Sequence, residues 1–138
     1  MAERRFSWWA VAAYILPTFP LGYSWHLTTF KQEYERLHIY RPDVLIPLGL
    51  SSMAIQALLF AWLYPRIFDR RREAWLRSAL GFGGTFGVLA WSFTTLPVAA
   101  KYQMSSITDF LILESAFTAL QFLVVAPLIA LAYRQPRA

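Results

Sequence analysis

Residues 109–133 read DFLILESAFTALQFLVVAPLIALAY, and this stretch decides the fold. Residues 110–132 are almost wholly apolar, and about 20 such residues are enough for a helix to cross a bilayer. The stretch carries one acidic side chain inside its ends, Glu114, together with Thr118 and Gln121. These three residues are spaced i, i+4 and i+7, so they share one helix face. Because polar groups are costly against lipid, we expect this face to point toward protein.

The composition is typical of an integral membrane protein. Hydrophobic residues make up 57% of the 138-residue chain and charged residues only 15%, whereas about a quarter of a soluble domain is charged. The six Trp and seven Tyr suit a protein with two membrane interfaces, where these side chains accumulate. We therefore expect one membrane domain over residues 1–138, with the lipid bilayer as its first partner.

Three further apolar stretches predict the helices that pack against the first. We expect an all-α, integral membrane four-helix bundle with spans at about residues 6–25, 44–64, 78–100 and 110–132. Pro17 and Pro20 lie inside the first span and should kink or loosen it. This feature is either a tolerated kink facing neighbouring helices or a broken helix that lines a cavity.

Residues 26–43 form a polar connection between the first and second spans. Phe30, Tyr34 and Leu37 are spaced i, i+4 and i+7 within it. This spacing predicts a short amphipathic helix that lies on the membrane surface. A solvated loop with scattered aromatic side chains is the alternative.

The distribution of basic residues predicts the orientation. Of the 13 Lys and Arg residues, nine fall at the termini or in the turn after the second span, and four fall in the other two loops. The side with more Lys and Arg is normally cytoplasmic. We therefore expect a multi-pass protein of the bacterial inner membrane with both termini in the cytoplasm. Because the bases flank spans, the net charge of +5 indicates topology, and we expect no nucleic-acid partner.

Two features of the predicted spans concern how the helices pack: a pair of glycines in the third span, and a set of polar side chains spread over all four spans. Gly83 and Gly87 form a GxxxG pair, which allows another helix backbone to approach closely. If Gln56 and Gln121 meet inside the bundle, they either hold helices together by hydrogen bonds or belong to a substrate site. We predict that a polar interior or ligand-binding face consists of Glu114, Thr118, Gln121, Gln56, Ser52, Tyr14, Thr18 and Ser92.

Glu114 is the only Asp, Glu, Lys, Arg or His within a predicted span, so it is a functional candidate by default. Its expected partners are Lys101, Arg41 or Tyr102 on the same side of the membrane, or polar groups on other spans. It is either a structural carboxylate paired with a loop base or a group for which protons and a substrate compete.

A short internal sequence similarity predicts two tandem helical hairpins. Residues 18–22 (TFPLG) resemble residues 95–99 (TLPVA), and each segment leads through a loop to an Asp that opens the next span, Asp43 and Asp109. A repeat of this kind would be related by an axis along the membrane normal. The match is short, and chance similarity is the alternative.

This sequence lacks the residues that most cofactors and metal ions require. The absence of Cys excludes disulfides, thiol catalysis and thiolate metal sites. His26 and His38 lie outside the spans, where they cannot form a bis-His haem site. We predict no catalytic residues, no metal site and no cofactor.

Three segments resemble small, uncharacterised four-span bacterial inner-membrane proteins of the domain-of-unknown-function type. They are LGYSWH at residues 21–26, PRIF at residues 65–68 and WSFTTLPVAAKY at residues 91–102. The resemblance implies a four-helix bundle and no known catalytic residue.

The leading functional expectation is a non-enzymatic accessory or assembly subunit. Such a subunit would pack through the Gly83–Gly87 face against itself or a larger membrane-protein complex. The alternative is a small transporter or a protein that binds a lipid or another apolar ligand, with a cavity between the first and third spans and Glu114 at its outer mouth. A third hypothesis, an enzyme acting on lipid head groups, would need His26 or His38.

Overall fold

The computed structural model describes residues 5–134, and this part of the chain contains helices and no strands. The helices follow the order α1 (Trp8–Ser24), the π-helix η1 (Trp25–Thr29), α2 (Lys31–Leu37), α3 (Ile46–Ile67), the 3-10 helix η2 (Arg72–Ala74), α4 (Trp75–Lys101) and α5 (Ile107–Tyr133). The all-α prediction is therefore confirmed.

Three segments are long and apolar enough to cross a membrane. They are Ile46–Ile67, Arg72–Lys101 and Ile107–Tyr133, which correspond to the second, third and fourth predicted spans. The first predicted span, α1, is α-helical over only 17 residues. The structure thus supports a helical membrane protein with three candidate spans, which is a coarser statement than the predicted four.

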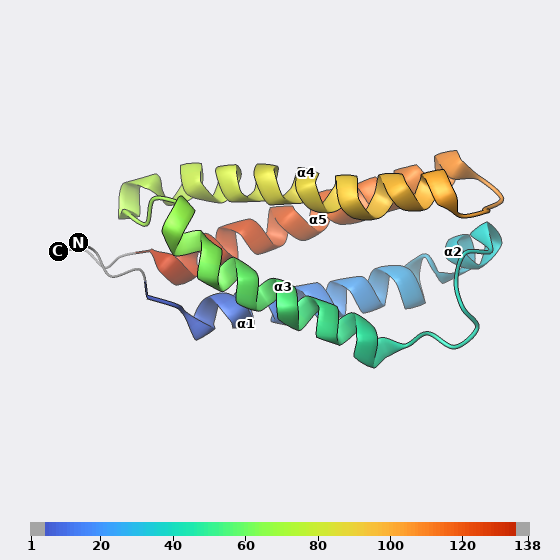
Figure 1. Cartoon of the computed structure of the whole chain (residues 1–138), viewed down its shortest axis with the longest axis horizontal. Coiled ribbons are helices and arrows are strands. Elements are labelled where there is room, and N and C mark those ends of the chain that lie inside the picture. The colour runs from blue at the N-terminus through green and yellow to red at the C-terminus, as the bar shows by residue number, and fades with distance from the viewer. Residues whose placement is uncertain (1–4, 135–138) are drawn as a thin grey trace.

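The four long helices run side by side along one axis (Figure 1). α5 packs against both α4 and α1, and α3 packs against α1. The contacting pairs α1–α3 and α4–α5 correspond to the two predicted hairpins, and the repeat between them stays a prediction. The proposed equivalence of Asp43 and Asp109 is wrong in detail, because Asp109 lies in the first turn of α5 whereas Asp43 precedes α3.

Small residues bring α4 and α5 together. A Cβ atom added to Gly83 would lie 3.0 Å from the Cβ of Ala126, and one added to Gly87 would lie 3.3 Å from the Cγ of Phe122. These distances are shorter than most real Cβ contacts, so a larger residue at either position would require the neighbouring side chain to shift by a few tenths of an ångström. The predicted close-packing pair therefore lies against a helix of the same chain.

Aromatic side chains fill the space between α3 and the α4–α5 pair. The ring centroids of Phe60 and Phe82 are 5.1 Å apart in an edge-to-face arrangement, and Phe60 also contacts Phe86 at 5.1 Å. Tyr64 stacks on Tyr133 with centroids 5.2 Å apart. Such pairs contribute about 0.5–1.5 kcal/mol beyond the apolar area that they bury, so they stabilise helices whose backbones are not close.

One end of the bundle, here called the arginine end, holds the start of α1, the end of α5 and the α3–α4 connection (Figure 1). The backbone N–H of Ser7 donates to the Tyr133 hydroxyl at 3.1 Å, and that hydroxyl donates to the carbonyl of Ala61. This hydroxyl therefore joins the segment before α1 to α3 and α5. The described basic residues at this end include Arg66, Arg70, Arg71, Arg72, Arg77 and Arg134, while Arg4 and Arg137 lie outside the described residues.

The opposite end, here called the Glu114 end, holds α2, residues 38–45 and residues 102–106 (Figure 1). The predicted amphipathic helix exists as α2, but its apolar face does not face outward. Tyr34 and Leu37 are buried and pack in a cluster with Phe110, while the Ser105 hydroxyl donates to the carbonyl of Arg36 at 2.6 Å. α2 therefore covers the end of the bundle.

The expected loosening of the first span occurs later in the chain than predicted. α1 remains α-helical at both Pro17 and Pro20. The helix widens only at Trp25–Thr29, where the N–H of Phe30 donates to the carbonyl of Trp25 at 3.0 Å. Single π-helical turns of this kind are frequent at functional sites.

Candidate functional site

Glu114 lies at the centre of a partly buried polar cluster at the Glu114 end. Its Oε1 atom accepts a hydrogen bond from the Tyr34 hydroxyl at 2.6 Å and lies 3.1 Å from His26 Nε2. Only 17% of the Glu114 side chain and 20% of the His26 side chain are exposed. The predicted partner Arg41 instead pairs with Asp43 at 3.4 Å. We call Glu114, His26, Tyr34 and Tyr40 the Glu114 cluster.

The wide turn of η1 directs His26 toward Glu114. His26 Nδ1 lies 3.0 Å from the carbonyl oxygen of Gly22, which can only accept a hydrogen bond, so Nδ1 carries a hydrogen. His26 Nε2 then faces the Glu114 carboxyl group, and one proton between these two atoms completes the contact. The pair is therefore electrically neutral when it holds this proton, and it carries one negative charge without it.

Two tyrosine rings close the cluster from the side of α2. The rings of Tyr34 and Tyr40 are stacked, with centroids 4.9 Å apart and an interplanar angle of 6°. Burial, followed by the nearby charge of Glu114, raises the pKa of both phenols well above the ordinary value. Both hydroxyl groups therefore stay protonated and can act as hydrogen-bond donors.

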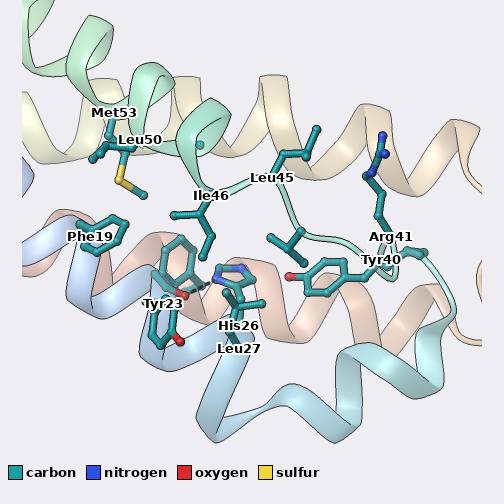
Figure 2. Close-up of a pocket in the computed structure, with 15 residues that line it drawn as sticks. Phe19, Tyr23, His26, Leu27, Tyr40, Arg41, Leu45, Ile46, Leu50 and Met53 are labelled. Atoms are coloured by element: carbon teal, nitrogen blue, oxygen red, sulfur yellow. Dashed lines mark hydrogen bonds between the residues drawn. The ribbon is translucent and has the colours of Figure 1, made fainter.

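A cavity of about 440 Å³ opens beside His26. Figure 2 shows the Tyr40 hydroxyl pointing across this cavity toward the His26 ring, whereas the Arg41 side chain extends away from both. The remaining walls are mostly apolar and come from α1, η1, the segment before α3 and the first half of α3: Phe19, Gly22, Tyr23, Leu27, Ile39, Val44, Leu45, Ile46, Gly49, Leu50, Met53 and Phe117 of α5. We call this space the His26 cavity.

The position of this cavity differs from the prediction. We expected a cavity between the first and third spans, but the His26 cavity lies between α1 and α3, the first and second long helices. The physical reason is the helix order, because α5 packs against both α1 and α4 and so occupies the space between them.

Four of the predicted polar residues form a second, separate group within the bundle. The Tyr14 hydroxyl donates to Gln56 Oε1 and accepts from Gln121 Nε2 at 3.2 Å. Gln56 Nε2 in turn donates to the Ser52 hydroxyl at 3.2 Å. Gln56 and Gln121 thus meet through Tyr14 and join α1, α3 and α5, which is the arrangement expected of a structural hydrogen-bond network.

The other predicted residues do not join Glu114. Thr118 is buried and lines a groove of about 620 Å³ between α4 and α5. The Thr18 hydroxyl is buried without a hydrogen-bond partner in the described part of the chain. Ser92 donates to the carbonyl of Leu89 in its own helix. The predicted polar stripe on the last span is therefore divided between separate environments.

The sequence did not identify His26, Tyr34 and Tyr40 as partners of Glu114. Tyr34 was recognised only as part of an apolar helix face, and His26 only as a residue outside the spans that the enzyme hypothesis would need. One signal was available, because both residues belong to the sole long connection on the side of the membrane predicted for Glu114. Within residues 5–134, no group of three or more His, Cys, Asp or Glu side chains could hold a metal ion.

Comparisons with protein-family models, curated proteins and solved structures give no match for this chain. The class of the protein is therefore inferred from its fold and its site. These define a helical protein with three candidate membrane spans and a partly buried Glu–His–Tyr cluster beside an apolar cavity.

Proposed function

We propose that this chain is a four-span protein of the bacterial inner membrane that binds a small apolar or amphipathic molecule in the His26 cavity. The observation that carries this proposal is the cavity itself. Its volume of about 440 Å³ lies within the range of about 300–1,000 Å³ that is usual for small-molecule sites. Its walls are mostly apolar, with a small number of polar groups at one end, which is also typical of such sites.

The fourth span of this proposal is α1 extended by η1. Together they cover residues 8–29 without interruption, and about 20 residues suffice for a crossing. Trp8 and Trp9 are 71% and 80% exposed at the arginine end, which suits side chains that lie at a membrane interface. The excess of Arg at that end favours a cytoplasmic location for it, so the His26 cavity would face the outer side.

A pair of glycine variants tests ligand binding in this cavity. Gly49 lines the cavity, and a Cβ added to it would meet, apart from its chain neighbours and the nearby backbone of its own helix, no atom of the described residues within 4 Å. A Gly49→Trp substitution should therefore fill the cavity with little disturbance to the helices. Gly84 lines the α4–α5 groove and is equally open, so Gly84→Trp is the matched control.

The probe is N-phenyl-1-naphthylamine, a neutral apolar fluorophore, titrated into the purified protein and corrected for uptake by detergent alone. The proposal predicts saturable binding by the unmodified chain and by Gly84→Trp, and loss of binding in Gly49→Trp. Equal binding by both variants, or no saturable binding by the unmodified chain, would contradict it.

The accessory subunit expected from the sequence is the second candidate. Its main argument, the Gly83–Gly87 pair, is weakened because α5 of the same chain occupies that face. The α4–α5 groove is the observation that still favours it, because Gly84 and the apolar walls of this groove are open to the surroundings. A defined oligomer or a co-purified partner in mild detergent would support this function, and a lone monomer would remove it.

A further inference from the structure

The walls of the His26 cavity and the charges around it favour a particular class of ligand. The cavity is lined by the rings of Phe19, Tyr23, Tyr40 and Phe117, together with the imidazole of His26. Aromatic faces attract cations, and this attraction is strongest where water is excluded. The cavity therefore offers more to an apolar cation than to a neutral or anionic molecule of the same size.

The charged groups at the Glu114 end agree with this preference. The bases of the long connection are paired with nearby acids: Lys31 lies 3.6 Å from Glu35, Arg36 lies 3.3 Å from Glu33, and Arg41 lies 3.4 Å from Asp43. Only Arg41 among them lines the cavity, and its side chain extends away from His26 (Figure 2). These pairs reduce the positive potential that an entering cation would meet.

The proton held between His26 and Glu114 controls the remaining charge. When the pair holds it, His26 and Glu114 together are neutral, and only the aromatic walls of the cavity attract a cation. When the proton leaves to solvent, the carboxylate charge behind the imidazole ring is no longer balanced. Because both side chains are mostly buried, that charge is weakly screened and acts on the cavity.

We infer that the ligand of the His26 cavity is a lipophilic monovalent cation that binds in exchange for the proton shared by His26 and Glu114. This inference rests on the proposed ligand-binding function and names its substrate class. The exchange is balanced: one cation enters, one proton passes from the pair to the solvent, and the charge of the occupied site stays the same.

The other titratable groups that face the pair are phenols, which stay protonated, so the exchanged proton belongs to His26 and Glu114. From α2 and the following segment, the pair faces the phenols of Tyr34 and Tyr40, and from α1 the cavity receives that of Tyr23. The side chains that α3 contributes to the cavity are apolar. In the described part of the chain, no hydrogen bond or ion pair joins the pair to α4.

Two ions of nearly identical shape test the charge preference. Tetraphenylphosphonium and tetraphenylborate differ in the sign of their charge, and each is titrated against the purified protein with correction for uptake by detergent micelles. We expect the cation to bind at least about tenfold more tightly than the anion once the proton has left the pair. Equal binding of the two ions would overturn the inference while leaving the proposed apolar site intact.

The coupling to a proton is tested by the dependence of cation affinity on pH and by direct proton release. Release of one proton per cation predicts an affinity that increases by up to about tenfold for each pH unit, in the alkaline direction. It also predicts acidification of a weakly buffered sample when tetraphenylphosphonium is added to the unmodified protein. Affinity that is independent of pH, without proton release, would overturn the inference.

A pair of variants assigns the effect to Glu114. Glu114→Gln keeps the shape of the side chain but cannot become an anion, so cation affinity should lose its pH dependence. Glu35→Gln removes an exposed acid that pairs with Lys31 at the same end, and it should leave the pH dependence of the cation affinity unchanged. If Gly49→Trp leaves apolar binding unchanged, the proposed function fails. If apolar binding passes that test but Glu114→Gln retains the pH dependence, only the cation inference fails.

Discussion

Removing the Tyr34 hydroxyl should destabilise the protein through the loss of one short hydrogen bond. The perturbation is Tyr34→Phe, which deletes the oxygen that lies 2.6 Å from Glu114 Oε1. The ring remains, so its stacking on Tyr40 and its packing against Leu37 and Phe110 are retained. The main contact that the substitution removes is therefore the one with the carboxyl group.

The expected magnitude follows from the length and burial of this bond. An O–H···O distance of 2.6 Å is typical of bonds to an ionised carboxylate. Such bonds contribute about 1.5–3 kcal/mol, and Tyr34 is fully buried. We expect the free energy of unfolding to decrease by about this amount. Tyr40→Phe should change it by less than about 0.5 kcal/mol, because the Tyr40 hydroxyl makes no hydrogen bond within the described residues.

The assay is reversible denaturation in detergent, followed by circular dichroism, for the unmodified chain and both variants. Combining Tyr34→Phe with Glu114→Gln gives a double-mutant cycle whose coupling energy measures this contact alone. If Tyr34→Phe costs no more than Tyr40→Phe, the hydrogen bond to Glu114 does not contribute as the structure indicates, and the reasoning is refuted.

Three further predictions concern the rest of the bundle. Gly83→Ala should destabilise the protein by about 1 kcal/mol or more, because the added Cβ would press on Ala126 of α5. Gly84→Ala is the control, because its Cβ would meet open space. In the same denaturation assay it should be neutral or should stabilise the protein by up to about 1 kcal/mol. Tyr133→Phe should reduce the unfolding free energy by about 1–3 kcal/mol through loss of its two backbone hydrogen bonds, and an unchanged value would contradict that role. Arg71 lowers the pKa of Asp69 by hydrogen bonds and charge, so the contribution of this pair to stability is present at neutral pH and is lost as the pH falls through the lowered pKa. Arg71→Gln should raise the Asp69 pKa toward 3.8 in an NMR titration, and an unmoved pKa would contradict the contact.

The helices could be predicted because apolar length and polar flanks determine them locally. The last span was expected at residues 110–132 and is Ile107–Tyr133 in the structure. Its additional first turn begins after Ser106, whose hydroxyl accepts from the N–H of Asp109 at 3.2 Å. The first span was harder, because two prolines suggested a break within the helix, whereas the change in helix type follows several residues later.

The candidate site could be predicted only in part, because its contacts join distant parts of the chain. Periodicity identified Glu114 as a residue on a protein-facing side, but its partners His26 and Tyr34 are 88 and 80 residues away in the sequence. Two backbone features bring them there. They are the π-helical turn at Trp25–Thr29 and the left-handed conformation of His38, which ends α2 with a φ of 60°. The spacing of apolar residues predicts neither the π-helical turn nor the left-handed residue.

The same limit explains why the predicted polar stripe was divided. Thr118 and Gln121 share a helix with Glu114, but a helix surrounded by different neighbours presents each turn to a different environment. Gln121 meets Tyr14 of α1, whereas Thr118 lines the groove beside α4. Predicting this division would have required the helix order, and specifically the position of α5 between α1 and α4.

The most direct test of the central proposal asks on which sides of the membrane the two ends of the bundle lie. Because the chain contains no cysteine, single substitutions Glu35→Cys at the Glu114 end and Arg70→Cys at the arginine end give unique labelling sites. A membrane-impermeant maleimide added to intact bacterial cells, after the outer membrane has been made permeable, should label Glu35→Cys at once. It should label Arg70→Cys only after the inner membrane has also been opened. Labelling of both positions from the same compartment would contradict the four crossings and the outward-facing cavity together.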